Sequence, residues 1–134
     1  MRDVSNSLFD FTKPTKCEQA VGIDGGGKPG LDHCFCLEGT GLKHAGRYVI
    51  MWLSWYSLID EEAGRTLEVW TTEPGMQVYM GNWIEGEYPH VAHTAVALEC
   101  QHYPDSPNKP TFPSTVLNPE DTYKQTTIFK IKND

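Results

Sequence analysis

Basic clusters and long apolar runs are both missing from this sequence. Its 11 Lys and Arg residues are outnumbered by 18 Asp and Glu residues, which gives a net charge of −7. Nucleic acids and anionic membranes bind clustered Lys and Arg, so we expect neither as a main partner. The strongest apolar run, residues 48–59, has about 12 residues, whereas a helix needs about 20 to span a bilayer. The composition therefore predicts a globular chain without a membrane span.

The chain also begins without the apolar segment of a signal peptide, so we expect a cytoplasmic protein. A length of 134 residues is typical of a single domain with its own core, here residues 1–134. The sequence contains four cysteines: Cys17, Cys34, Cys36 and Cys100. They could form two disulfides, but in the cytoplasm we expect them to remain reduced.

Long amphipathic helical patterns are absent as well, and short strand-like segments take their place. The 12 Gly and 9 Pro residues divide the chain into segments rich in β-branched and aromatic residues. The polar stretch 60–65 indicates a tight turn, and stretches 22–30 and 103–114 indicate loops. This organisation predicts an all-β fold, a sandwich of antiparallel sheets. The expected strands are His33–Leu37, Tyr48–Trp55, Thr66–Thr72, Met76–Asn82, Thr94–Glu99 and Thr122–Ile131. The last of these alternates in polarity, which predicts one partly solvated face.

A single glutamate stands between an apolar segment and a proline-rich one. Residues 95–98 lead into Glu99, and four prolines follow between residues 104 and 113. A carboxyl group held partly out of water at the end of a buried strand has its pKa raised, which suits proton exchange at neutral pH. A solvated glutamate at a strand end is the structural alternative. The proline-rich segment is either a rigid loop, which we favour, or a polyproline ligand.

A second carboxylate, Asp32, occupies a similar position. It follows a glycine-rich loop and precedes the expected strand His33–Leu37. Gln77 lies in another expected strand, and Trp83 and His102 are near these residues in sequence. Carboxylates and amides hydrogen-bond to hydroxyl groups, while aromatic rings pack on the apolar faces of a pyranose. These residue types together indicate a sugar-binding site.

Other motifs give weaker indications of chemistry. The glycine-rich stretch 24–28 lacks the Gly-Lys-Ser/Thr ending of a phosphate-binding P-loop. Residues 33–36 (His-Cys-Phe-Cys) offer soft metal ligands, but zinc sites usually pair two such knuckles. His90 and His93 lie in an expected loop, without a helix to present both rings. None of these motifs therefore gives a strong prediction of a phosphate or metal site.

Four segments, in this order, resemble a known family. They are residues 8–15 (LFDFTKPT), 30–35 (GLDHCF), 64–82 (GRTLEVWTTEPGMQVYMGN) and 98–108 (LECQHYPDSPN). Together they resemble the C-terminal part of the aldose 1-epimerase, or galactose mutarotase, family, and the resemblance covers nearly the whole chain. It implies a large antiparallel β-sandwich that interconverts the α and β anomers of galactose or glucose in hexose metabolism, without metal or cofactor.

The resemblance also implies roles for three residues. Glu99 would be the general base that takes the proton from the anomeric hydroxyl as the ring opens. Asp32 would bind sugar hydroxyls and orient the ring, and Gln77 would supply a further hydrogen bond. Ring opening of a hemiacetal needs a base at the anomeric oxygen and an acid at the ring oxygen, each contributing about 10²–10⁴-fold.

The chain departs from the family in length and in several motifs. Family members are more than twice as long, and their proton-donating histidine, a second histidine and a sugar-binding arginine precede the part seen here. Cys34 stands where the family has Asn, Val96-Ala97 replaces a Gly-Phe-type step, and the apolar stretch 46–57 reflects either altered splicing or a strand extension. Three interpretations remain: an epimerase completed by its missing N-terminal half, a sugar-binding domain without turnover, or a truncated product that self-associates through exposed sheet edges.

Overall fold

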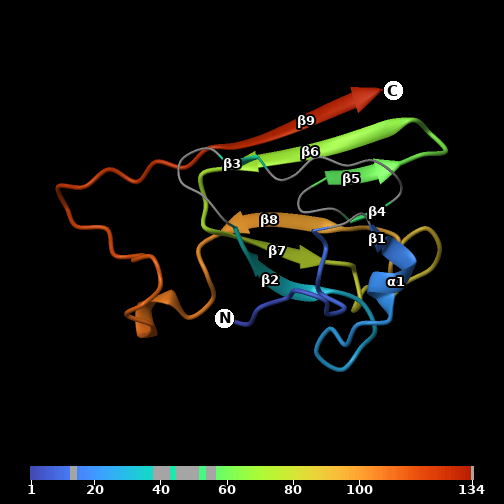
Figure 1. The fold of residues 1–134 in the computed structure, drawn as a ribbon, viewed down its shortest axis with the longest axis horizontal. Helices are drawn as coiled ribbons and strands as arrows, with labels where there is room; N and C mark the ends of the chain where they lie inside the picture. The colour runs from blue at the N-terminus through green and yellow to red at the C-terminus, as the bar shows by residue number, and fades with distance from the viewer. Residues whose placement is uncertain (13–14, 38–42, 45–51, 54–56, 134) are drawn as a thin grey trace.

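The computed structural model of the protein describes residues 1–12, 15–37, 43–44, 52–53 and 57–133. These residues form antiparallel β-sheets with one short α-helix (Figure 1), which confirms the predicted all-β fold. The expected strand 48–55 and the apolar stretch 46–57 lie mostly outside the described residues. The elements are β1 (Thr15–Lys16), α1 (Cys17–Val21), β2 (Asp32–Cys36), β3 (Lys43–His44), β4 (Trp52–Leu53), β5 (Ser57–Asp60), β6 (Arg65–Thr71), β7 (Gly75–Tyr79), β8 (Ala97–Gln101), the 3-10 helix η1 (Ser106–Asn108) and β9 (Thr127–Asn133).

One sheet joins three strands in the order β2–β7–β8, and both strand pairs are antiparallel. Successive side chains of a strand point to opposite faces, so Phe35, Met76 and Val78 share one face. Their exposed fractions are only 7%, 1% and 2%. Phe11 from the N-terminal segment packs edge-on against Phe35, with ring centroids 5.6 Å apart. This face of the sheet therefore forms part of the core.

The second sheet is built around β6. This strand pairs with β3 and β5, and also along its whole length with β9, the outermost strand in Figure 1. Val69 of β6 is 1% exposed and belongs to the same buried cluster as Met76 and Val78, so the two sheets share a core. The full buried cluster is Phe11, Ala20, Ile23, Leu31, Phe35, Leu37, Val69, Met76, Val78 and Met80.

The predicted turn at 60–65 connects β5 to β6 and is confirmed. Its geometry is fixed by Asp60, whose carboxylate accepts the Ala63 backbone N–H at 3.0 Å and pairs with Arg65 at 3.2 Å. The hydrogen bond from Ala63 and the nearby Arg65 guanidinium lower the pKa of Asp60. A single carboxylate thus holds both ends of this turn.

The predicted strand boundaries agree best for β2 and β6. The strands expected at 33–37 and 66–72 are confirmed within one residue as β2 and β6. The strand expected at 76–82 ends earlier, at Tyr79, because the chain turns at Gly81, whose φ is +69°. The strand expected at 94–99 is shifted and becomes β8, residues 97–101.

The prediction for the last strand was wrong in its bounds and in its burial. The strand expected at 122–131 lies at 127–133, and all of its residues except Thr127 are exposed. It has no half-buried face because β9 is an outer strand whose faces no other described element covers. The segment between β8 and β9 reaches well beyond the strand ends before it returns (Figure 1).

Two further expectations concern the cysteines and membranes. All four cysteines are free thiols, as predicted. Within the described residues, none of the helices has the length and apolar character to cross a bilayer.

Candidate functional site

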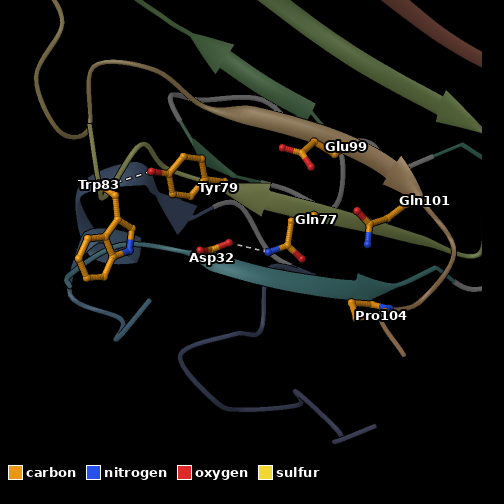
Figure 2. A pocket seen from close by; sticks show the side chains of 7 residues that line it. All are labelled: Asp32, Gln77, Tyr79, Trp83, Glu99, Gln101 and Pro104. Atoms are coloured by element: carbon orange, nitrogen blue, oxygen red, sulfur yellow. Dashed lines mark hydrogen bonds between the residues drawn. The ribbon is translucent and has the colours of Figure 1, made fainter. Parts of the chain in front are cut away.

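An open groove of about 480 Å³ lies on the face of the β2–β7–β8 sheet that points away from the core. Polar side chains dominate its lining, and they come from three strands and two following loops (Figure 2). The lining residues are Asp32, Gln77, Tyr79, Trp83, Glu99, Gln101 and Pro104. All three site residues expected from sequence therefore lie in one groove.

The register of the sheet brings these side chains together. Gln77 lies opposite Glu99 across the β7–β8 pair, and Tyr79 lies opposite Asp32 across the β2–β7 pair. Directly opposed residues in an antiparallel pair have Cβ atoms about 4.5–5.5 Å apart, so their side chains emerge side by side. Gln101 follows Glu99 by two positions and therefore shares its face.

A hydrogen bond links the first two predicted residues. The Gln77 amide Nε2 donates to Asp32 Oδ1 at 2.6 Å. This bond orients both side chains. No hydrogen bond from the described residues occupies the second Asp32 oxygen or the Gln77 carbonyl oxygen, so both can accept from a ligand. The pair thus presents two acceptors in a fixed arrangement beside Glu99.

Glu99 occupies a different setting from the one expected. It lies in the middle of β8 rather than at the end of a buried strand, and its side chain is exposed. The expectation of a partly buried carboxyl group was therefore wrong. The strand continues past Glu99 because Cys100 and Gln101 still pair with Met76 and Gly75 of β7.

Trp83 supplies one of the two aromatic rings of the groove. Its backbone N–H donates to the Tyr79 hydroxyl at 2.9 Å, which fixes the chain that leaves β7. The indole is 51% exposed, and the Lys28 ammonium group lies 4.4 Å from its ring centroid. Lys28 is itself held by Glu85 at 3.0 Å. In Figure 2, Trp83 and Pro104 lie at opposite ends of the row of polar side chains.

A buried amide holds the start of β2 in place. Asn82, 2% exposed, donates from Nδ2 to the carbonyl oxygens of Gly30 and Leu31 at 3.0 and 3.2 Å. A Cβ atom on Gly30 would lie 2.2 Å from Asn82 Oδ1, and the φ of Gly30 is +114°, so only glycine fits there. Asp32 begins β2 directly after this contact, as its place between loop and strand predicted.

Sequence reasoning missed some lining residues and misplaced one. Tyr79, Gln101 and Pro104 were not anticipated, although the two-residue period from Gln77 and Glu99 pointed to the first two. His102 does not line the groove: its Nδ1 lies 2.7 Å from a carboxylate oxygen of Glu73 instead.

The weaker motifs have structural partners. His93 Nε2 lies 2.8 Å from the Pro29 carbonyl oxygen, which ties the loop after β7 to the loop before β2. Among the described residues, no group of three or more His, Cys, Asp or Glu side chains is arranged to hold a metal ion. The glycine-rich stretch 24–28 forms a loop closed by the Gly25 N–H, which donates to the Lys28 carbonyl oxygen at 2.8 Å.

Beside the groove, burial changes the acidity of two neighbouring groups. Burial, with a smaller effect of Cys36, raises the pKa of the Cys34 thiol to about 11. Burial and the proximity of Cys36 raise the pKa of the Tyr103 phenol to about 12. Both groups are therefore neutral at physiological pH and add no charge to the groove.

The charge of the groove selects the kind of ligand. Its described lining contains two carboxylates, two amides and two aromatic rings, but no Lys or Arg. Such a surface repels anions and offers acceptors and donors to hydroxyl groups, while the Trp83 ring offers an apolar face. These features define a β-sheet protein with a groove suited to a neutral polyhydroxy ligand.

Comparison with known proteins places the chain in a family. The aldose 1-epimerase family profile matches residues 1–130. The galactose mutarotases of Pongo abelii and Homo sapiens are 38% and 37% identical to the chain over 135 residues, which is 95% of this chain. The aldose 1-epimerase of Escherichia coli strain K12 is 31% identical over 141 residues, 97% of this chain. The chain belongs to the aldose 1-epimerase family, whose members named here are isomerases.

The chain matches only part of the length of each of these relatives. The chain spans 36% of the length of the two mammalian galactose mutarotases and 38% of that of the bacterial enzyme. The groove is thus built from a portion corresponding to about a third of a typical relative.

Proposed function

We propose that the groove binds an aldohexose, galactose or glucose, and that Glu99 acts as the base of a mutarotase reaction in hexose metabolism. The observation that carries the proposal is the hydrogen-bonded Asp32–Gln77 pair, with Glu99 opposite Gln77 in the same groove. Membership of the aldose 1-epimerase family supports the reaction class. No metal or cofactor is invoked.

The proposed chemistry is a reversible ring opening. Glu99 takes the proton of the anomeric hydroxyl, the electron pair forms the carbonyl bond at C1, and the bond from C1 to the ring oxygen breaks. The ring oxygen receives a proton from an acid, which gives the open-chain aldehyde. Rotation about C1–C2 and the reverse steps produce the other anomer. Asp32 and Gln77 accept from the sugar hydroxyls and so fix the ring relative to Glu99.

A second candidate is a sugar-binding domain without turnover. Its support is the composition of the groove, since no histidine is present among the described residues that line it. Ring opening without an acid at the ring oxygen loses about 10²–10⁴-fold in rate. Asp32, Gln77 and Trp83 would still contact a sugar in this case.

Polarimetry of freshly dissolved α-D-galactose and α-D-glucose separates the two candidates. If the chain is a mutarotase, it accelerates the approach to anomeric equilibrium, and Glu99→Gln lowers that rate by about 10²–10⁴-fold. Glu62→Gln, an exposed glutamate in the β5–β6 turn, is the matched control and keeps the full rate. Equal rates for Glu99→Gln and the unchanged chain would refute the role of Glu99.

If the chain gives no acceleration, titration calorimetry with galactose decides between binding and no function. Heat that saturates at millimolar sugar, and that Asp32→Asn reduces, supports the binding domain. An absence of heat at these concentrations leaves only the truncated, self-associating product.

A further inference from the structure

The side chain of Glu73 is a buried carboxylate outside the groove. It lies between β6 and β7 and is 3% exposed. Its Oε2 lies 2.7 Å from His102 Nδ1, and its Oε1 accepts the hydroxyl of Tyr123 at 2.9 Å. A buried carboxylate is costly unless donors satisfy it, so these two contacts determine whether this arrangement is stable. With Glu73 ionised, His102 carries its proton on Nδ1.

His102 connects this carboxylate to the groove through the backbone. It directly follows Gln101 and precedes Pro104 by two positions, and both of these line the groove. The Gln101 side-chain amide also donates to the His102 carbonyl oxygen at 3.2 Å. The His102 ring itself lines a separate hollow of about 270 Å³ with Tyr123 and residues 114–117. Any effect of His102 on a ligand in the groove must therefore pass through its neighbours.

A second contact fixes the same piece of chain. The Tyr103 ring packs on Gly75, where a Cβ atom would lie 3.0 Å from the ring. Gly75 pairs with Gln101 across the β7–β8 ladder. The chain that follows β8 is thus held by two contacts. The contact of His102 with Glu73 is polar, and the contact of Tyr103 with Gly75 is apolar.

Tyr123 binds the same carboxylate from a different part of the chain. It lies in the segment before β9, and the hydrogen bond to Glu73 raises the pKa of its phenol, so the hydroxyl remains a donor. Thr126 joins this segment to Thr72 through two hydrogen bonds of 3.0 Å. Tyr123 and His102 both contact the Glu73 carboxylate, but among the described contacts Tyr123 has none with Gln101, so Tyr123 serves as a control for His102.

We propose that Glu73 and His102 form a positioning pair that sets Gln101 and Pro104 against the sugar, a role that rests on the proposed function of the groove. Gln101 then contributes its amide to the ligand beside Glu99. Neither Glu73 nor His102 touches the sugar. The pair acts by fixing where the chain leaves β8.

The test is a galactose titration of the full chain followed in ¹H–¹⁵N spectra, with the side-chain amide signals of Gln77 and Gln101 as reporters. His102→Leu removes the donor to Glu73 and is expected to weaken galactose binding about tenfold. It also shifts the Gln101 amide signals more than those of Gln77. His102→Asn restores a donor at a similar place and is expected to return the affinity to within about threefold of the unchanged chain.

Tyr123→Phe separates positioning from simple stability. Tyr123→Phe removes the other donor to Glu73. If the role of His102 is purely structural, Tyr123→Phe and His102→Leu both lower the unfolding midpoint, and galactose affinity stays unchanged in both folded proteins. That result, or equal loss of affinity in both variants, would overturn the proposal. Should His102→Leu not fold, Glu73→Gln keeps the volume and weakens both contacts, and unchanged affinity there would overturn it equally.

The same titration distinguishes failure of this pair from failure of the proposed function. If the unchanged chain does not bind galactose, the proposed function fails and the positioning role fails with it. If the unchanged chain binds galactose and His102→Leu binds it with the same affinity, only the positioning role fails.

Discussion

The two faces of the β2–β7–β8 sheet differ sharply although they share one backbone. Met76 and Gln77 are neighbours in sequence, yet Met76 is 1% exposed in the core whereas Gln77 lies partly exposed in the groove. The alternation of a β-strand produces this division. Backbone pairing sets the register of the three strands, and with that register the alternation places Asp32 and Glu99 on the face opposite the core. Stability and ligand binding should therefore respond to different residues along the same strand.

The largest expected effect comes from Met76→Ala. Removing a fully buried Met side chain costs about 2–5 kcal/mol of unfolding free energy, because it loses apolar burial and leaves a cavity. In the fraction that remains folded, galactose affinity should not change. Urea unfolding and a galactose titration at low temperature measure the two quantities separately.

Gln77→Ala is the matched change one residue along. It should alter the unfolding free energy by less than about 1 kcal/mol, since the side chain is partly exposed. Galactose binding should weaken about tenfold, because the bond to Asp32 and one acceptor are lost. If Gln77→Ala destabilised the fold as much as Met76→Ala, the division between the two faces would be wrong.

Much of this division was predictable from sequence, but its boundaries were not. The apolar and polar positions of β2 and β6 gave their limits within one residue, since both strands lie between local turn signals. The place of Asp32 at the start of a strand followed from the glycine-rich loop before it. The position of Glu99 within β8 did not, because pairing with β7, and not the local composition, determines where β8 ends.

The contacts between distant segments also could not be predicted from local patterns in the sequence. His102 reaches a carboxylate 29 residues away, and Tyr123 reaches the same group over 50 residues. No periodicity in the sequence links these positions. The sequence indicated residue types suited to a sugar but could not indicate that His102 contacts Glu73 and does not line the groove.

Asn82→Ala is expected to have an effect of intermediate size and to change both the stability of the fold and galactose binding. Asn82→Ala removes the amide that donates to Gly30 and Leu31, which leaves a buried carbonyl oxygen without this partner and costs about 1–3 kcal/mol. Because Asp32 follows directly, galactose affinity should fall as well. Urea unfolding and galactose titration of the same sample would show both changes. Asn82→Asp keeps the shape without the donor and should lose at least as much; full stability of that variant would contradict the argument.

The smallest effect concerns Cys34, a partly buried thiol of β2 that lies opposite Gln77 on the groove side of the sheet. Burial raises the pKa of its thiol from 9.0 to about 11, so folding favours the neutral form. The contribution of this group to stability is therefore fully present below pH 9.0 and is lost as the pH rises through about 11. The raised pKa values of Tyr103 and Tyr123 act in the same direction at higher pH.

Cys34→Ala should therefore reduce the fall in stability between pH 9.0 and about 11, while the contribution of Tyr103, which is lost from pH 10.0 through about 12, remains. Urea midpoints measured across this range, together with thiolate absorbance, give the comparison. Cys100→Ala removes a thiol from the opposite face and is the matched control. If Cys100→Ala flattened the curve as much as Cys34→Ala, the alkaline loss of stability would not be specific to Cys34. A larger effect of Cys34→Ala than of Cys100→Ala would show that burial of the Cys34 thiol causes part of the alkaline loss of stability.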